Sequence, residues 1–156
     1  MALKTDIRGM THTYPDYFEV SREKIREYAK AVKAVDPASF DEAAATEQGH
    51  DALIAPPTFT SILALLVQED FFRHVDIGLE SMRIVQVDQR FTYHRPVKAG
   101  DRLWARLEIE SVDERFGADI VVTRNTCTDD QGELVMEAFT TLMGQQDGES
   151  AKIHGL

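Results

Sequence analysis

The sequence predicts an α+β domain in which a long antiparallel sheet curls around one buried helix. Helical periodicity runs from Ser21 to about Phe72, and extended periodicity runs from about Met82 to Met143. Helices followed by a block of strands are typical of α+β folds rather than of alternating βαβ units. Residues 59–67 are apolar on nearly all sides of a helix, which is typical of a helix that other elements wrap.

Length and composition fit one globular domain with one core. The chain has 156 residues, and 17 basic against 27 acidic residues give a net charge of −10, which argues against a nucleic-acid partner. The single cysteine, Cys127, excludes a disulfide scaffold and fits a reducing compartment. The best apolar run, Ile62 to Val67, is far shorter than the roughly 20 residues of a membrane span. We therefore expect a cytoplasmic protein without a membrane span.

Three helices are predicted in the first half. The first begins after Ser21, a good N-cap, and should end at Asp36-Pro37, because the residue before a proline avoids helical geometry. Its apolar face consists of Ile25, Tyr28, Ala29 and Val32. A short Ala-rich helix follows and ends near Gly49. The third and buried helix should start at Pro56-Pro57, since proline is tolerated in a first helical turn.

Four strands are predicted in the second half, around residues 85–93, 103–109, 120–126 and 134–142. In the first of them, Val85, Val87, Phe91 and Tyr93 alternate with polar residues, which predicts a half-buried strand. Such a meander around a buried helix is the hot-dog fold. We expect one hot-dog domain over residues 1–145 and a flexible C-terminal tail over residues 146–156, which are polar and contain glycine.

Stretches along almost the whole chain resemble the MaoC-like, hydratase-2-like hot-dog family. Within it, the chain is most similar to the non-catalytic subunits of mycobacterial (3R)-hydroxyacyl-ACP dehydratases, first to the C-type and second to the A-type. The matching stretches include DIRGM, YPDYFEV, REKIREYAKAVK, FFRHVDIG, IVQVDQRF, KAGDRLWAR, SVDERFGADIVVTRN and GELVMEAFTTLMGQ. The resemblance implies dehydration of a 3-hydroxyacyl thioester during elongation of long, mycolate-type fatty acids.

The catalytic motif of the family is degenerate in this chain. In active relatives an Asp and a His, in a loop around a proline, carry out the proton transfers. Anchored on Pro37, the corresponding positions hold Ala34 and Ser39, with Asp36 between them. Alanine cannot exchange a proton, and an unassisted serine hydroxyl is a poor acid or base at neutral pH. The resemblance therefore implies that this chain alone is inactive and that no residue of the motif is catalytic.

The resemblance implies a substrate-binding subunit that pairs with a homologue carrying the Asp and His. Its acyl channel would lie at the start of the third helix, along Thr58, Phe59, Ser61, Ile62 and Leu65. A basic stripe on the first helix is a candidate docking site for an acidic acyl carrier protein: Arg22, Arg26, Lys30 and Lys33. No cofactor and no metal are expected, because the histidines share no ligand spacing. A homodimer could form when the partner is missing.

Simpler interpretations remain open at this level. The channel residues could be plain core, and the basic stripe could be a solvated helix face. The chain could instead be a self-associating thioesterase that activates water with Glu69 or Asp70, or a lipid-binding homo-oligomer without chemistry. His50-Asp51 could replace the missing acid–base pair, although adjacent residues seldom converge on one atom.

Overall fold

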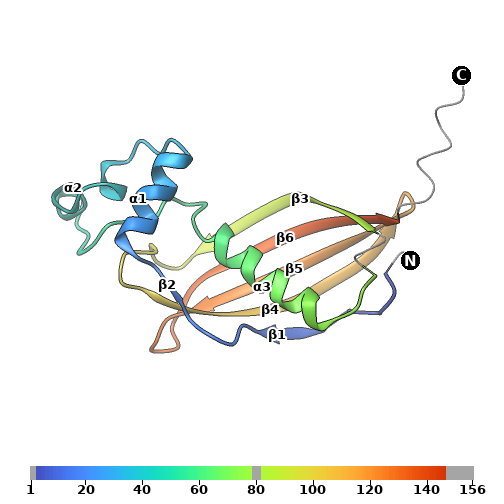
Figure 1. Cartoon of the computed structure of the whole chain (residues 1–156). Coiled ribbons are helices and arrows are strands. Elements are labelled where there is room, and N and C mark those ends of the chain that lie inside the picture. The colour runs from blue at the N-terminus through green and yellow to red at the C-terminus, as the bar shows by residue number, and fades with distance from the viewer. Residues whose placement is uncertain (1–2, 79–81, 147–156) are drawn as a thin grey trace, which may run out of the picture.

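The computed structural model of the protein describes residues 3–78 and 82–146, and it confirms the α+β class and the hot-dog arrangement. Helix α3 (Ser61–His74) lies along one face of a six-stranded antiparallel sheet (Figure 1). The main path of the sheet runs β1 (Thr11–Thr13), β4 (Arg102–Arg115), β5 (Ala118–Thr128), β6 (Leu134–Gln146) and β3 (Met82–Tyr93). The short strand β2 (Phe18–Glu19) also pairs with β4. Among the described residues, β3 is therefore a long edge strand of the sheet.

Strict alternation builds β4, as predicted. Leu103, Ala105, Leu107 and Ile109 are buried, whereas the residues that alternate with them point away from the core. The hairpin from β4 to β5 turns at Phe116 and Gly117, whose φ angles of 56° and 73° both lie in the left-handed region. Hairpin turns with two positive φ values match the right-handed twist of long strands, so these residues let β4 and β5 pair along their whole length.

Helix α1 (Arg22–Ala31) starts as predicted, because Oγ of Ser21 accepts a hydrogen bond from the backbone N–H of Lys24 at 3.2 Å. It ends well before Asp36, so the predicted end at Asp36-Pro37 is wrong. Lys33 adopts a left-handed φ of 55°, and the N–H of Ala34 donates to the carbonyl oxygen of Ala29 at 2.8 Å. This turn closes the helix before the proline can end it.

Helix α2 (Glu42–Glu47) confirms the Ala-rich helix and its end near Gly49, where φ is +86°. Oδ1 of Asp41 accepts from the N–H of Ala44 at 3.0 Å and caps its start. A one-turn 3₁₀ helix, η1 (Pro37–Ser39), lies between α1 and α2. Both α1 and α2 lie beyond one end of the sheet (Figure 1).

Helix α3 begins later than predicted, at Ser61 instead of Pro56-Pro57. The carbonyl oxygen of Pro56 accepts from the N–H of Phe59 at 2.9 Å, so this segment forms turns rather than the first α-helical turn. One face of α3 supplies Leu63, Val67 and Phe71 to the core that it shares with β4. The opposite face is open, and Leu65 is 56% exposed. The sheet therefore buries one face of the predicted central helix, and the opposite face stays open in this chain by itself.

Strand β3 also departs from its predicted burial. Phe91 and Tyr93 pack against the core, but Val85 and Val87 are 49% and 52% exposed. A bulge between Gln86 and Asp88 shifts the pairing with β6 and breaks the alternation that the sequence suggested. Half of the predicted buried face of β3 is thus at the surface.

The described residues form one sheet with one continuous core, and none of their helices is long and apolar enough to cross a membrane. Strand β6 continues to Gln146, just past the predicted domain boundary. The rest of the predicted flexible tail lies outside the described residues.

Candidate active-site region

The loop predicted to correspond to the catalytic motif of the family is built around Asp36. Its Oδ1 accepts from the backbone N–H of Ala38 and from Nε2 of Gln48, each at 3.0 Å. The bond from Gln48, followed by that from Ala38, holds the pKa of Asp36 below its ordinary value. Asp36 is therefore an ionised cap of η1, which is a structural task for a carboxylate next to a proline.

Ser39, which the sequence predicts at the position of the family's histidine, is 2% exposed. Its hydroxyl donates to the backbone carbonyl of Ile54 at 2.7 Å and joins η1 to the segment that precedes α3. A hydroxyl proton held in this way is not available to a leaving group. Ala34, predicted at the position of the aspartate, carries only a methyl group. Neither of these two side chains is thus suited to proton transfer.

The predicted channel residues are divided between core and surface. Phe59 is fully buried, and its ring packs edge-to-face on Tyr28 with centroids 5.4 Å apart. Thr58 is exposed, and its Oγ1 lies 2.8 Å from the Tyr28 hydroxyl. Ser61 and Ile62 are half-buried in the first turn of α3, about one helical turn before the exposed Leu65. The structure therefore places these residues along one route from loop to helix, with only Phe59 wholly inside.

Tyr93, the last residue of β3, contacts the turn that precedes α3. Its hydroxyl lies 3.0 Å from Oγ1 of Thr60 and donates to the carbonyl oxygen of Pro57. Burial raises the pKa of this phenol, which stays protonated at neutral pH. Tyr93 therefore fixes the turn before α3 against the sheet. The sequence pattern marks Tyr93 only as a strand residue, because nothing local links it to Pro57 and Thr60.

An open groove follows the outer side of α3 toward β3 and β6. It encloses about 490 Å³ and is lined by Leu65, Gln68, Glu69, Phe72, Arg73, Ile84 and Leu142. Most of this lining is apolar, and Leu65 is the one predicted channel residue within it. An apolar groove of this size can accept either a hydrocarbon chain or side chains of another protein.

The acidic residues on α3 already have partners. Oε2 of Glu69 lies 3.7 Å from Nη2 of Arg73, and both side chains are at least half exposed. Oδ2 of Asp70 lies 2.7 Å from Nε2 of His12 on β1. Neither carboxylate is placed in an enclosed pocket, as an activated water in a thioesterase would require.

Asp51, a candidate acid–base group, and two other reactive side chains are also in structural contacts. Asp51 accepts from Nζ of Lys98 at 2.7 and 2.6 Å, and this hydrogen bond lowers its pKa. His94 lies 3.2 Å from Oε2 of Glu137 on the neighbouring strand β6. Cys127 is buried, and this burial raises its pKa to about 12, so its thiol is not a nucleophile.

Several buried side chains on β5 carry polar atoms without a hydrogen-bond partner among the described residues. They include Oγ1 of Thr123 and both amide atoms of Asn125. Thr123 pairs with Ile109 and Asn125 with Leu107, so both lie on the inner face that α3 covers. Buried polar atoms without a protein partner usually bind ordered water or a ligand. The space under α3 therefore differs from a purely hydrocarbon core.

The basic stripe of α1 is divided by ion pairs. Nε of Arg22 lies 2.8 Å from Glu42, and Arg26 bonds both Glu23 and Glu42 at 2.8 and 3.0 Å. The side chains of Lys30 and Lys33 have no such partner among the described residues. Lys33 also lies beyond the end of α1 and not on the helix, as the sequence had suggested. Within this stripe, only the two lysines present uncompensated charge.

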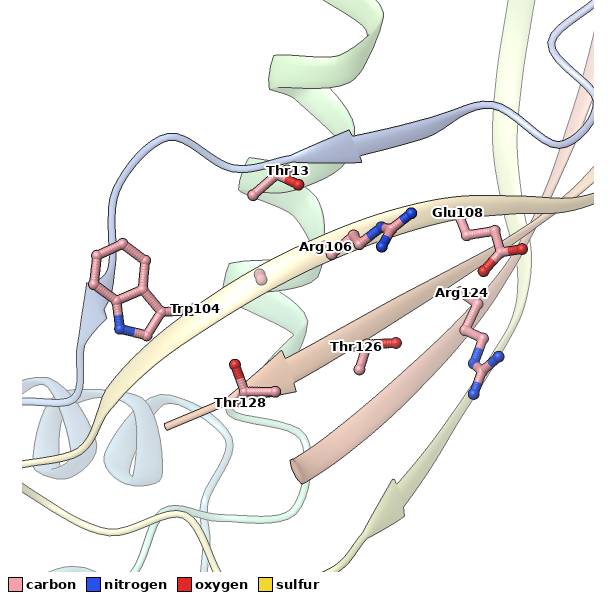
Figure 2. A pocket seen from close by; sticks show the side chains of 8 residues that line it. Thr13, Trp104, Arg106, Glu108, Arg124, Thr126 and Thr128 are labelled. Carbon is pink, nitrogen blue, oxygen red and sulfur yellow. The ribbon is translucent and has the colours of Figure 1, made fainter. Parts of the chain in front are cut away.

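A separate pocket of about 390 Å³ lies on the outer face of the sheet, away from α3. Figure 2 shows Arg106 and Glu108 of β4 and Arg124 of β5 around it, with Trp104 at one end. Arg124 is paired with Glu137 at 3.0 Å, whereas Arg106 has no hydrogen-bond partner among the described residues. This pocket and the loop of Ser39 lie on different parts of the molecule. The sequence indicated only the alternation of the strands that line it.

Comparison with known proteins agrees with the fold. Residues 8–138 match the profile of the FAS1-like, dehydratase domain region family. A UPF0336 protein of Mycobacterium tuberculosis is 69% identical over 153 residues, which cover 98% of this chain and 92% of the relative. Another UPF0336 protein of that organism is 46% identical over 151 residues, covering 96% of each chain.

Comparison with solved structures also finds dehydratases. One is similar with a TM-score of 0.86 and 69% identity, covering 90% of this chain and 99% of that chain. It belongs to a C-terminally truncated HadBC (3R-hydroxyacyl-ACP dehydratase) complex from Mycobacterium tuberculosis. A MaoC-like dehydratase is 35% identical with a TM-score of 0.84, covering 90% of this chain and 43% of that one.

The fold and these similarities thus define a hot-dog protein of the dehydratase class. The chain belongs to the FAS1-like, MaoC-like dehydratase family and is homologous to the UPF0336 proteins of mycobacteria.

Proposed function

We propose that this protein is the substrate-binding, non-catalytic subunit of a heteromeric (3R)-hydroxyacyl-ACP dehydratase. A homologous hot-dog subunit would supply the Asp and His, and the complex would act in the elongation of long, mycolate-type acyl chains. The similarity to one chain of the HadBC complex supports a dehydratase subunit. The proposal concerns what this chain does within such a complex.

One observation carries the non-catalytic role. The positions that match the catalytic pair are Ala34, which has no titratable group, and Ser39, whose proton is held by the Ile54 carbonyl. Dehydration requires a base for the α-proton and an acid for the leaving hydroxyl. Since the loop offers neither, another subunit has to provide them.

The open edge of β3 supports a partner. Val85 and Val87 are half exposed on this strand, and the apolar groove along Leu65 and Phe72 lies on the neighbouring helix α3. A long edge strand with exposed β-branched residues is a liability unless another strand covers it. We infer that the partner pairs along β3 and fills or extends this groove.

Substrate binding is inferred from the interior under α3 and from the route along Phe59, Ile62 and Leu65. A long acyl chain is held mainly by area removed from water, about 0.8 kcal/mol per CH₂ group. The unsatisfied atoms of Thr123 and Asn125 would face the polar part of such a substrate or its ordered water. Lys30 and Lys33 remain as the docking cations for an acidic carrier protein.

The deciding measurement is hydration of a long trans-2-enoyl thioester by the purified chain, by the Asp/His-bearing homologue, and by the two coexpressed. We expect no turnover from the chain alone and high turnover from the complex. As a control, Ser39→Ala in the complex should destabilise the loop without changing the pH profile of turnover, because Ser39 exchanges no proton.

Turnover by the isolated chain that survives Ser39→Ala would overturn the non-catalytic role. Equal turnover by the homologue with and without this chain would overturn the subunit role. Hydrolysis of the thioester by the isolated chain, lost in Glu69→Ala, would instead support the thioesterase alternative.

A further inference from the structure

A cluster of two histidines and an aspartate joins β1 to the C-terminal end of α3. One ligand atom each of His12, Asp70 and His74 lies within 4.8 Å of the other two. His12 pairs with Leu107 across the sheet, so its side chain points to the inner face, toward α3. Asp70 and His74 are separated by about one turn of α3, a spacing that places both side chains on one helical face.

We propose that His12, Asp70 and His74 form a site for a divalent first-row transition metal, with Zn²⁺ as its most fitting occupant. Imidazole nitrogen and carboxylate oxygen are ligands that Zn²⁺ accepts, and three protein ligands leave one tetrahedral position for water. This inference is independent of the proposed dehydratase function.

The hydrogen bonds around the cluster orient the ligands. Nδ1 of His74 lies 2.7 Å from the backbone carbonyl oxygen of Asp70, and only a protonated Nδ1 can donate to it. In the neutral ring, Nε2 then keeps its lone pair for a metal. Metal-binding histidines are commonly oriented in this way by a carbonyl bonded to the other nitrogen.

The side chains need only small movements to close on an ion. Zn²⁺ bonds of about 2.0 Å bring tetrahedral ligand atoms to about 3.3 Å from one another. Nε2 of His12 and Oδ2 of Asp70 are already 2.7 Å apart, and Zn²⁺ would replace the proton between them. His74 is exposed and its ring lies 5.5 Å from that of His12, so a small shift of this side chain completes the set.

The bound ion would fasten β1 to α3. Without it, this connection depends on the bond between His12 and Asp70 and on ring contacts of His12 with Phe71 and His74. Because the ligands come from residues 12, 70 and 74, they meet only in the folded chain. Zn²⁺ should therefore bind the native state in preference to the unfolded state and stabilise it.

The test is titration of the untagged full chain with Zn²⁺ by calorimetry, together with thermal unfolding with and without the ion. We expect one Zn²⁺ per chain and a rise in the unfolding temperature, with no comparable effect of Mg²⁺ or Ca²⁺, which prefer all-oxygen sites. Each of His12→Gln, Asp70→Asn and His74→Ala should weaken Zn²⁺ binding about tenfold or more.

His94→Ala is the matched control, because it removes an exposed imidazole that is paired with the Glu137 carboxylate elsewhere on the sheet. This variant should bind Zn²⁺ as the unmodified chain does. The proposal is overturned if His94→Ala weakens binding as much as His74→Ala does, or if the unmodified chain does not bind Zn²⁺. His74→Ala changes an exposed side chain, so it keeps the test decisive even if His12→Gln does not fold.

Discussion

Individual residues in the loop around Pro37 make structural hydrogen bonds. Asp36 caps η1, and Ser39 ties that helix to Ile54. Elsewhere the interior retains polar groups that the fold itself does not satisfy, at Thr123 and Asn125. Leaving a buried polar atom unpaired costs free energy, so its presence points to a purpose other than stability.

At the scale of single residues, we predict that Thr123→Val stabilises the free chain and lowers the turnover of the complex. Valine has nearly the shape of threonine but lacks the unsatisfied hydroxyl, so the free energy of unfolding should rise by about 1 kcal/mol. If the hydroxyl meets the substrate or its water, turnover of the long enoyl thioester should fall at the same time. Chemical denaturation and the hydration assay measure the two effects.

Thr140→Val is the control for this change. Thr140 is equally buried, but its Oγ1 accepts from Nε2 of Gln89 at 3.4 Å. Its replacement should lower the free energy of unfolding, because Gln89 loses an acceptor. If Thr123→Val lowers the free energy of unfolding as much as Thr140→Val does, the hydroxyl of Thr123 has a partner in the free chain. The prediction is then wrong.

Helix α3 is covered on one face only, and strand β3 is paired along one edge only. Leu65 is exposed on the helix, and Val85 and Val87 are exposed on the strand at the end of the sheet. Strand β4, in contrast, has β1 and β2 on one edge and β5 on the other. Helix α3 and strand β3 are therefore the elements that the proposed partner would cover.

We accordingly expect Val85→Lys combined with Val87→Lys to weaken association with the Asp/His-bearing homologue by about tenfold or more. Lysines on an edge strand oppose pairing with another strand, because pairing would bury their charges. Both positions are half exposed, so the chain itself should fold. Sedimentation or size-exclusion chromatography of the mixed subunits measures the association.

Phe116→Lys provides the comparison, since Phe116 is a fully exposed apolar residue at the tip of the β4–β5 hairpin. This change should leave association intact. Unaltered association of the Val85/Val87 double variant would show that the partner does not use β3.

Across the whole molecule, the net charge of −10 opposes any acidic partner. Ion pairs compensate Arg22 and Arg26, whereas Lys30 and Lys33 carry positive charge that no ion pair compensates among the described residues. Docking of a carrier protein would thus depend on a small local patch and should be sensitive to salt.

The corresponding prediction concerns Lys30→Glu combined with Lys33→Glu in the complex. We expect KM for a carrier-bound enoyl substrate to rise several-fold, with little change in KM for the same acyl group on coenzyme A. Arg106→Glu reverses a charge on the outer face of the sheet, away from α1, and should have no such effect. Equal changes in both KM values would indicate a disturbed channel rather than lost docking.

Periodicity was enough to predict most of the fold. The alternation of β4, the cap at Ser21 and the turn at Gly49 all depend on neighbours within a few residues, so local patterns identified them. The degenerate catalytic motif around Pro37 stays a prediction, which depends on residue identity alone. The end of α1 was missed, since the left-handed turn at Lys33 has no glycine to mark it.

Contacts between distant segments were decided only by the tertiary structure. The sequence by itself determined a hot-dog domain, and it predicted Ala34 and Ser39 at the positions of the catalytic pair. It did not determine that Val85, Val87 and Leu65 lie open, that Arg22 and Arg26 are neutralised, or that His12 meets Asp70 and His74. The physical reason is that exposure and side-chain pairing depend on which elements become neighbours, and residues far apart in the chain carry no local pattern that indicates their contact.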